Sequence, residues 1–191
     1  MSIIMAAGNK SGIIIIADSR CVWSNDNGKQ IIQEDYEKII KASDGTCIAF
    51  AGSVMHCIPV VNELCDMIQQ HKIRGVETYT EFCAMTASNM MELDPSTNIQ
   101  MIIAGRTCND ELAYGALTYY SNVQETTITK CTNDDLYYTV RSCLDPKDDF
   151  IGPIMQQTQY SVISRMRLCV QVASMKSDYI NNRIREEFIR N

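Results

Sequence analysis

The chain opens on two apolar runs that are separated by a short polar stretch. Residues 2–8 and 12–18, "SIIMAAG" and "GIIIIAD", are apolar at nearly every position. Strands that are covered on both faces show this pattern, because neither face has to be polar. The stretch Asn9-Lys10-Ser11 stands between two glycines, which is typical of a β-hairpin turn. We therefore expect an antiparallel pair of strands that is buried on both faces.

The register of this hairpin decides which polar side chains meet at its open end. A three-residue loop sets Gly8 opposite Gly12. Counting back, Ser2 then lies opposite Asp18, on one face, with Cβ atoms roughly 5 Å apart. A two-residue turn would set Ser19 opposite Ser2 and turn Asp18 to the other face. We expect the three-residue loop.

Farther along the chain, strand-like and helix-like segments follow one another in blocks. A polar stretch with a turn at Asn25–Gly28 leads into the expected strands 37–43 and 46–52. Apolar residues at helical spacing then predict helices at 53–72 and 76–93, the second ending before Pro95. The expected remainder is, in order, strands 98–105, 111–120 and 124–131, a helical region 152–179, and a segment 182–191 that is a closing strand or a helix end.

This order of elements favours an α+β protein over alternating βαβ units. The chain has 191 residues, of which 46% are hydrophobic. That length and content fit a single domain over residues 1–191 with a substantial core.

Composition and charge exclude several classes of function. The formal net charge is -6, and the 17 basic residues form no run, so we expect no nucleic-acid partner and no anionic membrane surface. The longest apolar stretches fall far short of the roughly 20 residues that span a bilayer. We expect no secretory leader before Met1, and hence a soluble, cytoplasmic protein.

The cysteines and histidines predict neither disulfides nor a metal site. The nine cysteines are odd in number and widely spaced, without a CxxC pair, which is typical of buried free thiols in a reducing cytosol. The only histidines are His56 and His71, and no Cys/His spacing of metal-site type occurs. We expect no cofactor.

Ser2 directly follows the start methionine. Methionine aminopeptidases remove Met before small residues, so we expect the mature chain to begin at Ser2 with a free α-amine. An α-amine titrates at about 7.7 to 8.0, which suits a general base for the hydroxyl of its own residue. One residue would then carry both nucleophile and base. The plain alternative is a polar first residue without a chemical role.

Several segments resemble one known family in their order and spacing. "GIIIIADSR", then "YEKIIK", then "CIAFAGSV" resemble the signature of proteasome β-subunits and of the bacterial peptidase HslV. The segments "MIIAG", "LAYGA" and "VQVASMKSDY" extend the resemblance more weakly. These proteins are N-terminal nucleophile (Ntn) hydrolases. The resemblance implies a four-layer αββα sandwich of two mainly antiparallel sheets between helix layers.

The resemblance also implies a catalytic role for five residues. Ser2 would be the nucleophile, with its own amine as the base. Lys38 would be the lysine that lowers the pKa of the hydroxyl or relays its proton, and Asp18 would hold Lys38 in place. Gly52 would supply the backbone N–H of the oxyanion hole. Asp178 would be the late acid that steadies the N-terminal residue.

Each of the last four residues also has an ordinary structural interpretation. Lys38 is alternatively a solvated cation at a strand end, and Asp18 a hairpin carboxylate paired with Arg20. Gly52 is alternatively the turn from a strand into a helix, a role compatible with the catalytic one. Asp178 is alternatively a polar residue at a helix C-terminus.

The chain departs from the family pattern at two points. The nucleophile is Ser instead of the usual Thr, which removes a methyl group that would fix the rotamer but keeps the hydroxyl. The Gly- and Ser-rich loop expected before the late helix is replaced by "YTVRSC", where Ser142 is the candidate for the remaining loop serine.

The leading functional hypothesis is a proteasome-like Ntn hydrolase that cleaves peptide (amide) bonds by acyl transfer to Ser2. A non-catalytic proteasome-like structural subunit and a small-molecule amidase on the same fold are the alternatives. By resemblance, the partners are a peptide or amide substrate, further copies in a homo-oligomeric ring around an inner chamber, and a separate ATPase. A hydrolase of this length carries no unfolding motor of its own, but neither the ring size nor an ATPase partner can be read from the sequence.

Overall fold

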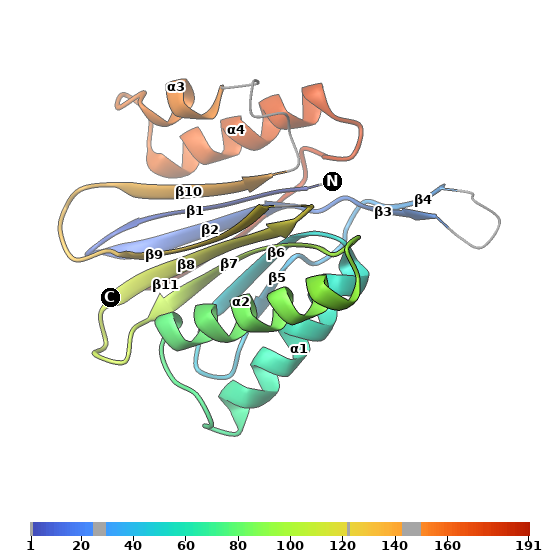
Figure 1. Ribbon diagram of the computed structural model, residues 1–191. Coiled ribbons are helices and arrows are strands. Elements are labelled where there is room, and N and C mark those ends of the chain that lie inside the picture. The colour runs from blue at the N-terminus through green and yellow to red at the C-terminus, as the bar shows by residue number, and fades with distance from the viewer. Residues whose placement is uncertain (1, 25–29, 122, 143–149) are drawn as a thin grey trace.

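The computed structural model describes residues 2–24, 30–121, 123–142 and 150–191. Two antiparallel sheets form its centre (Figure 1). The four-stranded sheet has the order β10 (Tyr137–Ser142), β1 (Ile3–Asn9), β2 (Gly12–Asp18), β11 (Ile184–Arg190). The five-stranded sheet has the order β5 (Ile39–Lys41), β6 (Cys47–Gly52), β7 (Asn98–Arg106), β8 (Leu112–Tyr120), β9 (Val123–Lys130).

Helices cover the outer faces of both sheets. The helices α1 (Val54–Gln69) and α2 (Val76–Leu93) lie on the five-stranded sheet. The helices α3 (Ile151–Met155) and α4 (Val162–Lys176) lie on the four-stranded sheet (Figure 1). The expected α+β fold, a four-layer sandwich with two sheets between helix layers, is therefore confirmed.

The core explains why the first two strands are continuous apolar runs. In β2, Ile13 and Ile15 point into the cluster between the two sheets. Ile14 and Ile16 point the other way, into the cluster beneath α4. Since alternate side chains leave opposite faces of a strand, both faces of β2 must be apolar.

The register of the β1–β2 hairpin differs from the expected one. Asn9 pairs with Gly12 and Ile4 with Ala17, so the turn consists of two residues and not three. The Oδ1 atom of Asn9 accepts the N–H of Ser11 at 2.9 Å, which keeps Asn9 in the ladder and closes the tight turn. Continued past Ile4, this register sets Ser2 opposite Ser19, so the expected Ser2–Asp18 cross-strand pair is wrong.

Two other segments differ from the expected elements, and the closing segment follows one of its two expected alternatives. The helical region 152–179 is broken after α3, and α4 begins afresh because Ser161 Oγ accepts the N–H of Ser164 at 3.3 Å as an N-cap. The segment "YTVRSC" contributes β10, which pairs with β1. The closing segment is a strand, β11. The expected turn at Asn25–Gly28 lies outside the described residues.

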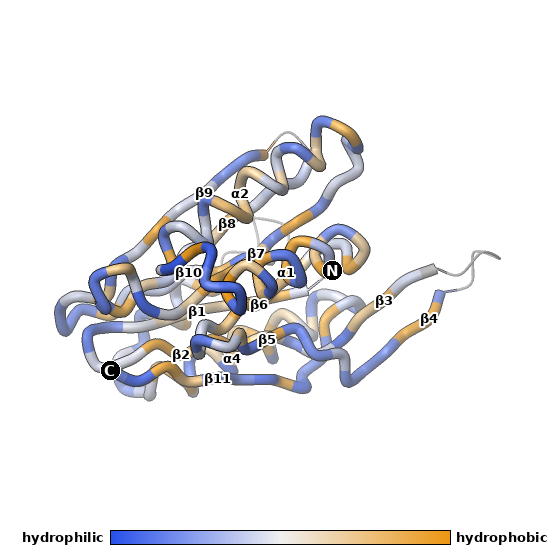
Figure 2. The backbone as a smooth tube through the Cα atoms, turned by 90° about the horizontal axis from the view of Figure 1, so that it is seen from below, coloured by the Kyte–Doolittle hydropathy of each residue, from blue (hydrophilic) through white to orange (hydrophobic). Residues whose placement is uncertain are grey.

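A small hairpin that the sequence did not predict projects from the body. The strands β3 (Cys21–Ser24) and β4 (Gln30–Gln33) pair only with each other in the described structure. Figure 2 shows this hairpin extending away from the sandwich. Its apolar side chains Trp23, Ile31 and Ile32 are exposed.

Two further findings concern the described part of the chain. None of its helices combines the length and apolar character needed to cross a membrane. Its eight cysteines are free thiols, of which six are buried, Cys65 is half-buried and Cys108 is exposed.

Candidate active site

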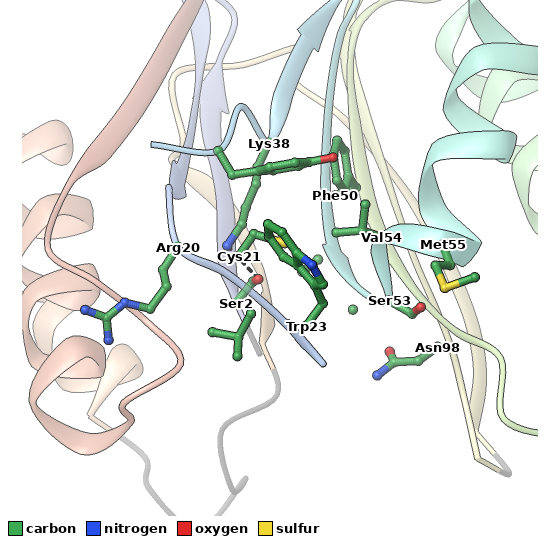
Figure 3. A pocket seen from close by; sticks show the side chains of 14 residues that line it. Ser2, Arg20, Cys21, Trp23, Lys38, Phe50, Ser53, Val54, Met55 and Asn98 are labelled. Carbon is green, nitrogen blue, oxygen red and sulfur yellow. Dashed lines mark hydrogen bonds between the residues drawn. The ribbon is translucent and has the colours of Figure 1, made fainter. Parts of the chain in front are cut away.

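The amino group of Lys38 stands between a hydroxyl and a carboxylate. Lys38 Nζ lies 2.6 Å from Ser2 Oγ, 2.9 Å from Asp18 Oδ1 and 3.0 Å from Asp18 Oδ2. None of the three residues is more than 4% exposed. Figure 3 shows the Lys38 side chain pointing at Ser2. An ammonium group has no lone pair, so Ser2 Oγ accepts this bond and keeps its own proton for another acceptor.

Asp18 reaches Lys38 despite the changed register because it lies where β2 ends. By alternation Asp18 belongs with Ile16 on the helix-facing side. Its carboxylate, however, accepts the backbone N–H of Ile3 at 2.9 Å and of Arg20 at 3.0 Å, which holds the group at the end of the sheet. Local side-chain bonding at a strand end therefore replaces the cross-strand pairing.

Lys38 comes from the opposite sheet. It immediately precedes β5, and its carbonyl accepts the N–H of Phe50 at 3.1 Å, which continues the pairing of β5 with β6. The side chain then crosses to the ends of β1 and β2. The two sheets must stack in register for this buried ion pair to form.

A cavity of about 580 Å³ opens beside Ser2 and Lys38. Tyr36 and Phe50 meet edge to face in its wall, with ring centroids 6.3 Å apart. Burial raises the pKa of the Cys21 thiol in the same wall, and the Lys38 charge opposes that shift. The other lining residues are Arg20, Val22, Trp23, Ala51, Gly52, Ser53, Val54, Met55 and Asn98 (Figure 3).

Gly52 ends β6 at the edge of this cavity. Its φ of 101° is in the left-handed region, and a Cβ atom there would lie 2.6 Å from the carbonyl oxygen of Asn98, so only glycine fits. The N–H of Ser53 donates to that oxygen in β7, whereas the N–H of Phe50 points to the β5 side. By alternation the N–H of Gly52 also points to the β5 side, beyond the start of β5, and so faces the cavity.

The structure separates Asp178 from the group around Lys38. The Asp178 side chain is exposed, and its backbone carbonyl accepts a hydrogen bond from the guanidinium of Arg20. Ser142 lies in β10 opposite Ile3. Thus Ser2, Asp18, Lys38 and Gly52 gather at one end of the sandwich, while the carboxylate of Asp178 points to solvent.

Asn181 is a supporting residue that sequence reasoning missed. It is 5% exposed. Its Oδ1 accepts the N–H of Ser19 at 3.1 Å, and its Nδ2 donates to the carbonyl and carboxylate of Glu34 at 2.9 and 2.7 Å. The only signal in the sequence was a pair of amides after Ile180, which says nothing of the partners. Trp23, Phe50 and Asn98 in the cavity wall were also missed, because no local pattern joins them.

Within the described residues, no group of three or more His, Cys, Asp or Glu side chains could hold a metal ion.

Comparisons with known proteins find likeness in structure alone. No family model and no curated protein matches the sequence. Anbu (ancestral beta-subunit) from Yersinia bercovieri superposes with a TM-score of 0.73 at 12% identity, over 98% of this chain and 81% of that one. Anbu from Pseudomonas aeruginosa, solved as a helical assembly, gives 0.72 at 13% identity, over 98% and 81%.

HslV from Trypanosoma brucei gives a TM-score of 0.63 at 13% identity, over 99% of both chains. These likenesses extend over essentially the whole sandwich, including both sheets and the helix layers. The chain therefore has the fold of Anbu and HslV.

Proposed function

We propose that the protein is an Ntn hydrolase that cleaves amide bonds with Ser2 as its nucleophile. One observation carries the proposal: Lys38 Nζ is 2.6 Å from Ser2 Oγ within a buried ion pair to Asp18, at the mouth of a cavity. An ordinary surface lysine would point to solvent. A buried cation on a hydroxyl stabilises the alkoxide form, which is the more reactive nucleophile.

The first half of the reaction forms an ester on Ser2. After Met1 is removed, the α-amine of Ser2 takes the proton from Oγ as Oγ attacks the carbonyl carbon of the substrate. The Lys38 ammonium stabilises the negative charge that develops on Oγ. The N–H of Gly52 donates to the tetrahedral oxyanion. The C–N bond then breaks, and the leaving amine takes the proton from the α-ammonium.

The second half of the reaction releases the acid. The α-amine deprotonates a water molecule as this water attacks the carbonyl carbon of the Ser2 ester. The C–O bond to Oγ then breaks, and Oγ recovers a proton from the α-ammonium. In both halves the α-amine of Ser2 is the general base: it accepts a proton first from Oγ and then from water, and it passes each proton to the leaving group.

The wall of the cavity favours a large apolar side chain on the acyl side of the cleaved bond. Its lining includes the apolar and aromatic side chains of Trp23, Tyr36, Phe50, Val54 and Met55. Apolar groups of a bound substrate gain free energy by leaving water for such a wall. We therefore expect peptides with Leu, Met or Phe at this position to be cleaved faster than those with Asp or Glu.

A peptide epoxyketone tests the proposal, because it forms bonds to both the hydroxyl and the α-amine of one residue. Intact mass spectrometry first establishes that Met1 is absent. We expect a single adduct on Ser2, no adduct in Ser2→Ala, and an unchanged adduct in Ser11→Ala, whose side chain is in the exposed turn. Labelling that persists in Ser2→Ala, or that falls on a cysteine, contradicts the proposal.

The same labelling experiment, together with a cleavage assay, distinguishes the two alternative functions. If the correctly processed chain takes no adduct and cleaves no peptide, the non-catalytic structural subunit replaces the present proposal. If it takes the adduct but cleaves only short acyl amides, the small-molecule amidase does.

We also propose that copies of this chain associate. The Anbu structure from Pseudomonas aeruginosa is a helical assembly, and the present chain shares that fold. Light scattering on the untagged protein is expected to give a mass several times 21.6 kDa. Electron microscopy then distinguishes a closed ring from an open helix. A monomer at micromolar concentration contradicts this part of the proposal.

A separate ATPase is the last part of the proposal. We expect the protein to cleave short peptides alone and to degrade a folded protein only when an ATPase and ATP are added. Degradation of a folded protein without ATP contradicts the need for that partner.

A further inference from the structure

A closed ring of hydrogen bonds fixes the turn between β6 and α1. The N–H of Ser53 donates to the carbonyl of Asn98 at 2.9 Å, and the N–H of His56 donates to the carbonyl of Ser53 at 3.1 Å. The N–H of Asn98 donates to His56 Nδ1 at 3.1 Å, which closes the ring. An imidazole nitrogen therefore takes the place of the backbone carbonyl that usually pairs with the first N–H of a strand.

The other imidazole nitrogen is held by a carboxylate. Since Nδ1 accepts a hydrogen bond, the neutral ring carries its proton on Nε2, which faces Asp94 Oδ2 at 3.3 Å. The N–H and hydroxyl of Ser96 donate to the other oxygen of Asp94 at 2.9 and 2.7 Å. These bonds lower the pKa of Asp94, with His56 contributing less. Asp94 thus fixes both the tautomer and the orientation of His56.

The ring of hydrogen bonds acts on Gly52 through Asn98. The carbonyl and side-chain oxygens of Asn98 lie 2.6 and 2.7 Å from the place where a Gly52 Cβ would be, so Asn98 packs directly against the Gly52 backbone. The Asn98 Oδ1 atom is buried without a hydrogen-bond partner among the described residues, so its own bonding does not hold it there. The N–H of Asn98 is held by His56, and its carbonyl is held by the N–H of Ser53.

We propose that His56 is a positioning residue, which fixes Asn98 and Ser53 and so aims the N–H of Gly52 at the cavity beside Ser2. The catalytic part of this inference rests on the proposed function. His56 is not itself a lining residue of the cavity, and it acts on the reaction only through Ser53 and Asn98, which are.

Two substitutions of His56 separate the roles of its nitrogens. In His56→Asn the side-chain oxygen takes nearly the position of Nδ1 and still accepts the Asn98 N–H. In His56→Gln the amide reaches toward Asp94 instead, and the Asn98 N–H loses its acceptor. His71→Asn is the matched control, because His71 is exposed with φ of 54°, a conformation that Asn tolerates.

For peptide cleavage we expect kcat of His56→Gln to fall by about tenfold to a hundredfold, with KM within roughly twofold, because a misplaced donor weakens the transition state. We expect His56→Asn and the control to stay within about threefold of the unchanged protein. Equal kcat in His56→Gln and in the unchanged protein would overturn the inference.

Amide hydrogen exchange gives a second readout that needs no activity. We expect the N–H groups of Ser53 and Asn98 to exchange faster in His56→Gln and at the original rate in His56→Asn. Unchanged exchange in a folded His56→Gln protein shows that His56 does not hold the turn, whatever the kinetics. If the protein without substitutions takes no epoxyketone adduct on Ser2, the proposed function is overturned. Amide hydrogen exchange alone then decides whether His56 holds the turn.

Discussion

The Lys38 side chain contributes both to the stability of the fold and to the proposed reaction. Its ammonium lies in a site where Asp18 is fully buried and Lys38 is 2% exposed. Removing two ions from water costs several kcal/mol each, and their mutual attraction offsets that cost only with good geometry. Here the carboxylate also accepts two backbone N–H groups, from Ile3 and Arg20. Loss of activity on removing Lys38 would therefore not by itself separate catalysis from folding.

A double substitution distinguishes the role of Lys38 in catalysis from its role in folding. Lys38→Met leaves the buried Asp18 carboxylate without its cation, and we expect the free energy of unfolding to fall by about 3 to 5 kcal/mol. Asp18→Asn combined with Lys38→Met removes the uncompensated charge and is expected to recover a large part of this loss. Denaturant unfolding measures both variants.

Neither variant is expected to form the epoxyketone adduct on Ser2, because both lack the cation. A double variant that is stable and still labelled would mean that Lys38 serves only the fold.

Among the helices and strands, the sequence predicted which segments form strands better than it predicted how those strands pair. The apolar runs of β1 and β2 were recognisable because both faces of each strand are buried. Their register was not, because it depends on whether Asn9 belongs to the turn or to the ladder. The resemblance named Asp18 and Lys38 independently of the register, and the structure places both beside Ser2, while their catalytic roles stay a prediction. The β3–β4 hairpin was missed because its strands are short and largely exposed.

The segment between α4 and β11 ties distant elements together at the site. Asn181 joins this segment to Ser19 after β2 and to Glu34 after β4. Asp178 was suggested for this region by the resemblance of "VQVASMKSDY" to the end of the family's late helix and the acid after it. The contacts of Asn181 depend on three segments that meet only in the folded chain.

We expect Asn181→Ala to lower the free energy of unfolding by about 1 to 3 kcal/mol, because the N–H of Ser19 and the carbonyl of Glu34 lose a buried partner. Asn191→Ala is the control, because Asn191 is exposed and bonds only at the surface. Chemical denaturation compares the two. Equal stability of both variants would show that the buried amide contributes nothing to the fold.

For the whole molecule, the two-sheet core buries thiols and phenols as well as aliphatic groups. Burial raises the pKa of Cys47 and Cys131 to about 11 and that of Cys169 to about 12. Burial and, for Tyr79, the hydrogen bond to Asp44 raise the pKa of Tyr79 and Tyr114 to about 12. The folded chain thus keeps protons that the unfolded chain releases in mild base.

This difference predicts alkaline destabilisation. Above about pH 8.5 the unfolded state loses thiol protons that the folded state retains, so the free energy of unfolding falls as pH rises toward 11. Below that pH both states hold these protons and the dependence vanishes. Denaturant unfolding with a reductant from about pH 8 to 10.5 measures it. Cys47→Ala is expected to reduce the slope. A flat profile would contradict the burial of these thiols.

The chain has one tryptophan, Trp23, and it is 41% exposed in the wall of the cavity (Figure 3). The protein therefore has its own optical reporter, since all indole fluorescence comes from beside Ser2. An apolar acyl group bound there removes water from the indole, and we expect emission to shift to shorter wavelength in proportion to occupancy. A stopped-flow record of this signal would follow acylation and deacylation within one turnover. Emission that stays unchanged while mass spectrometry shows a complete Ser2 adduct would mean that the acyl group lies away from the β3–β4 hairpin.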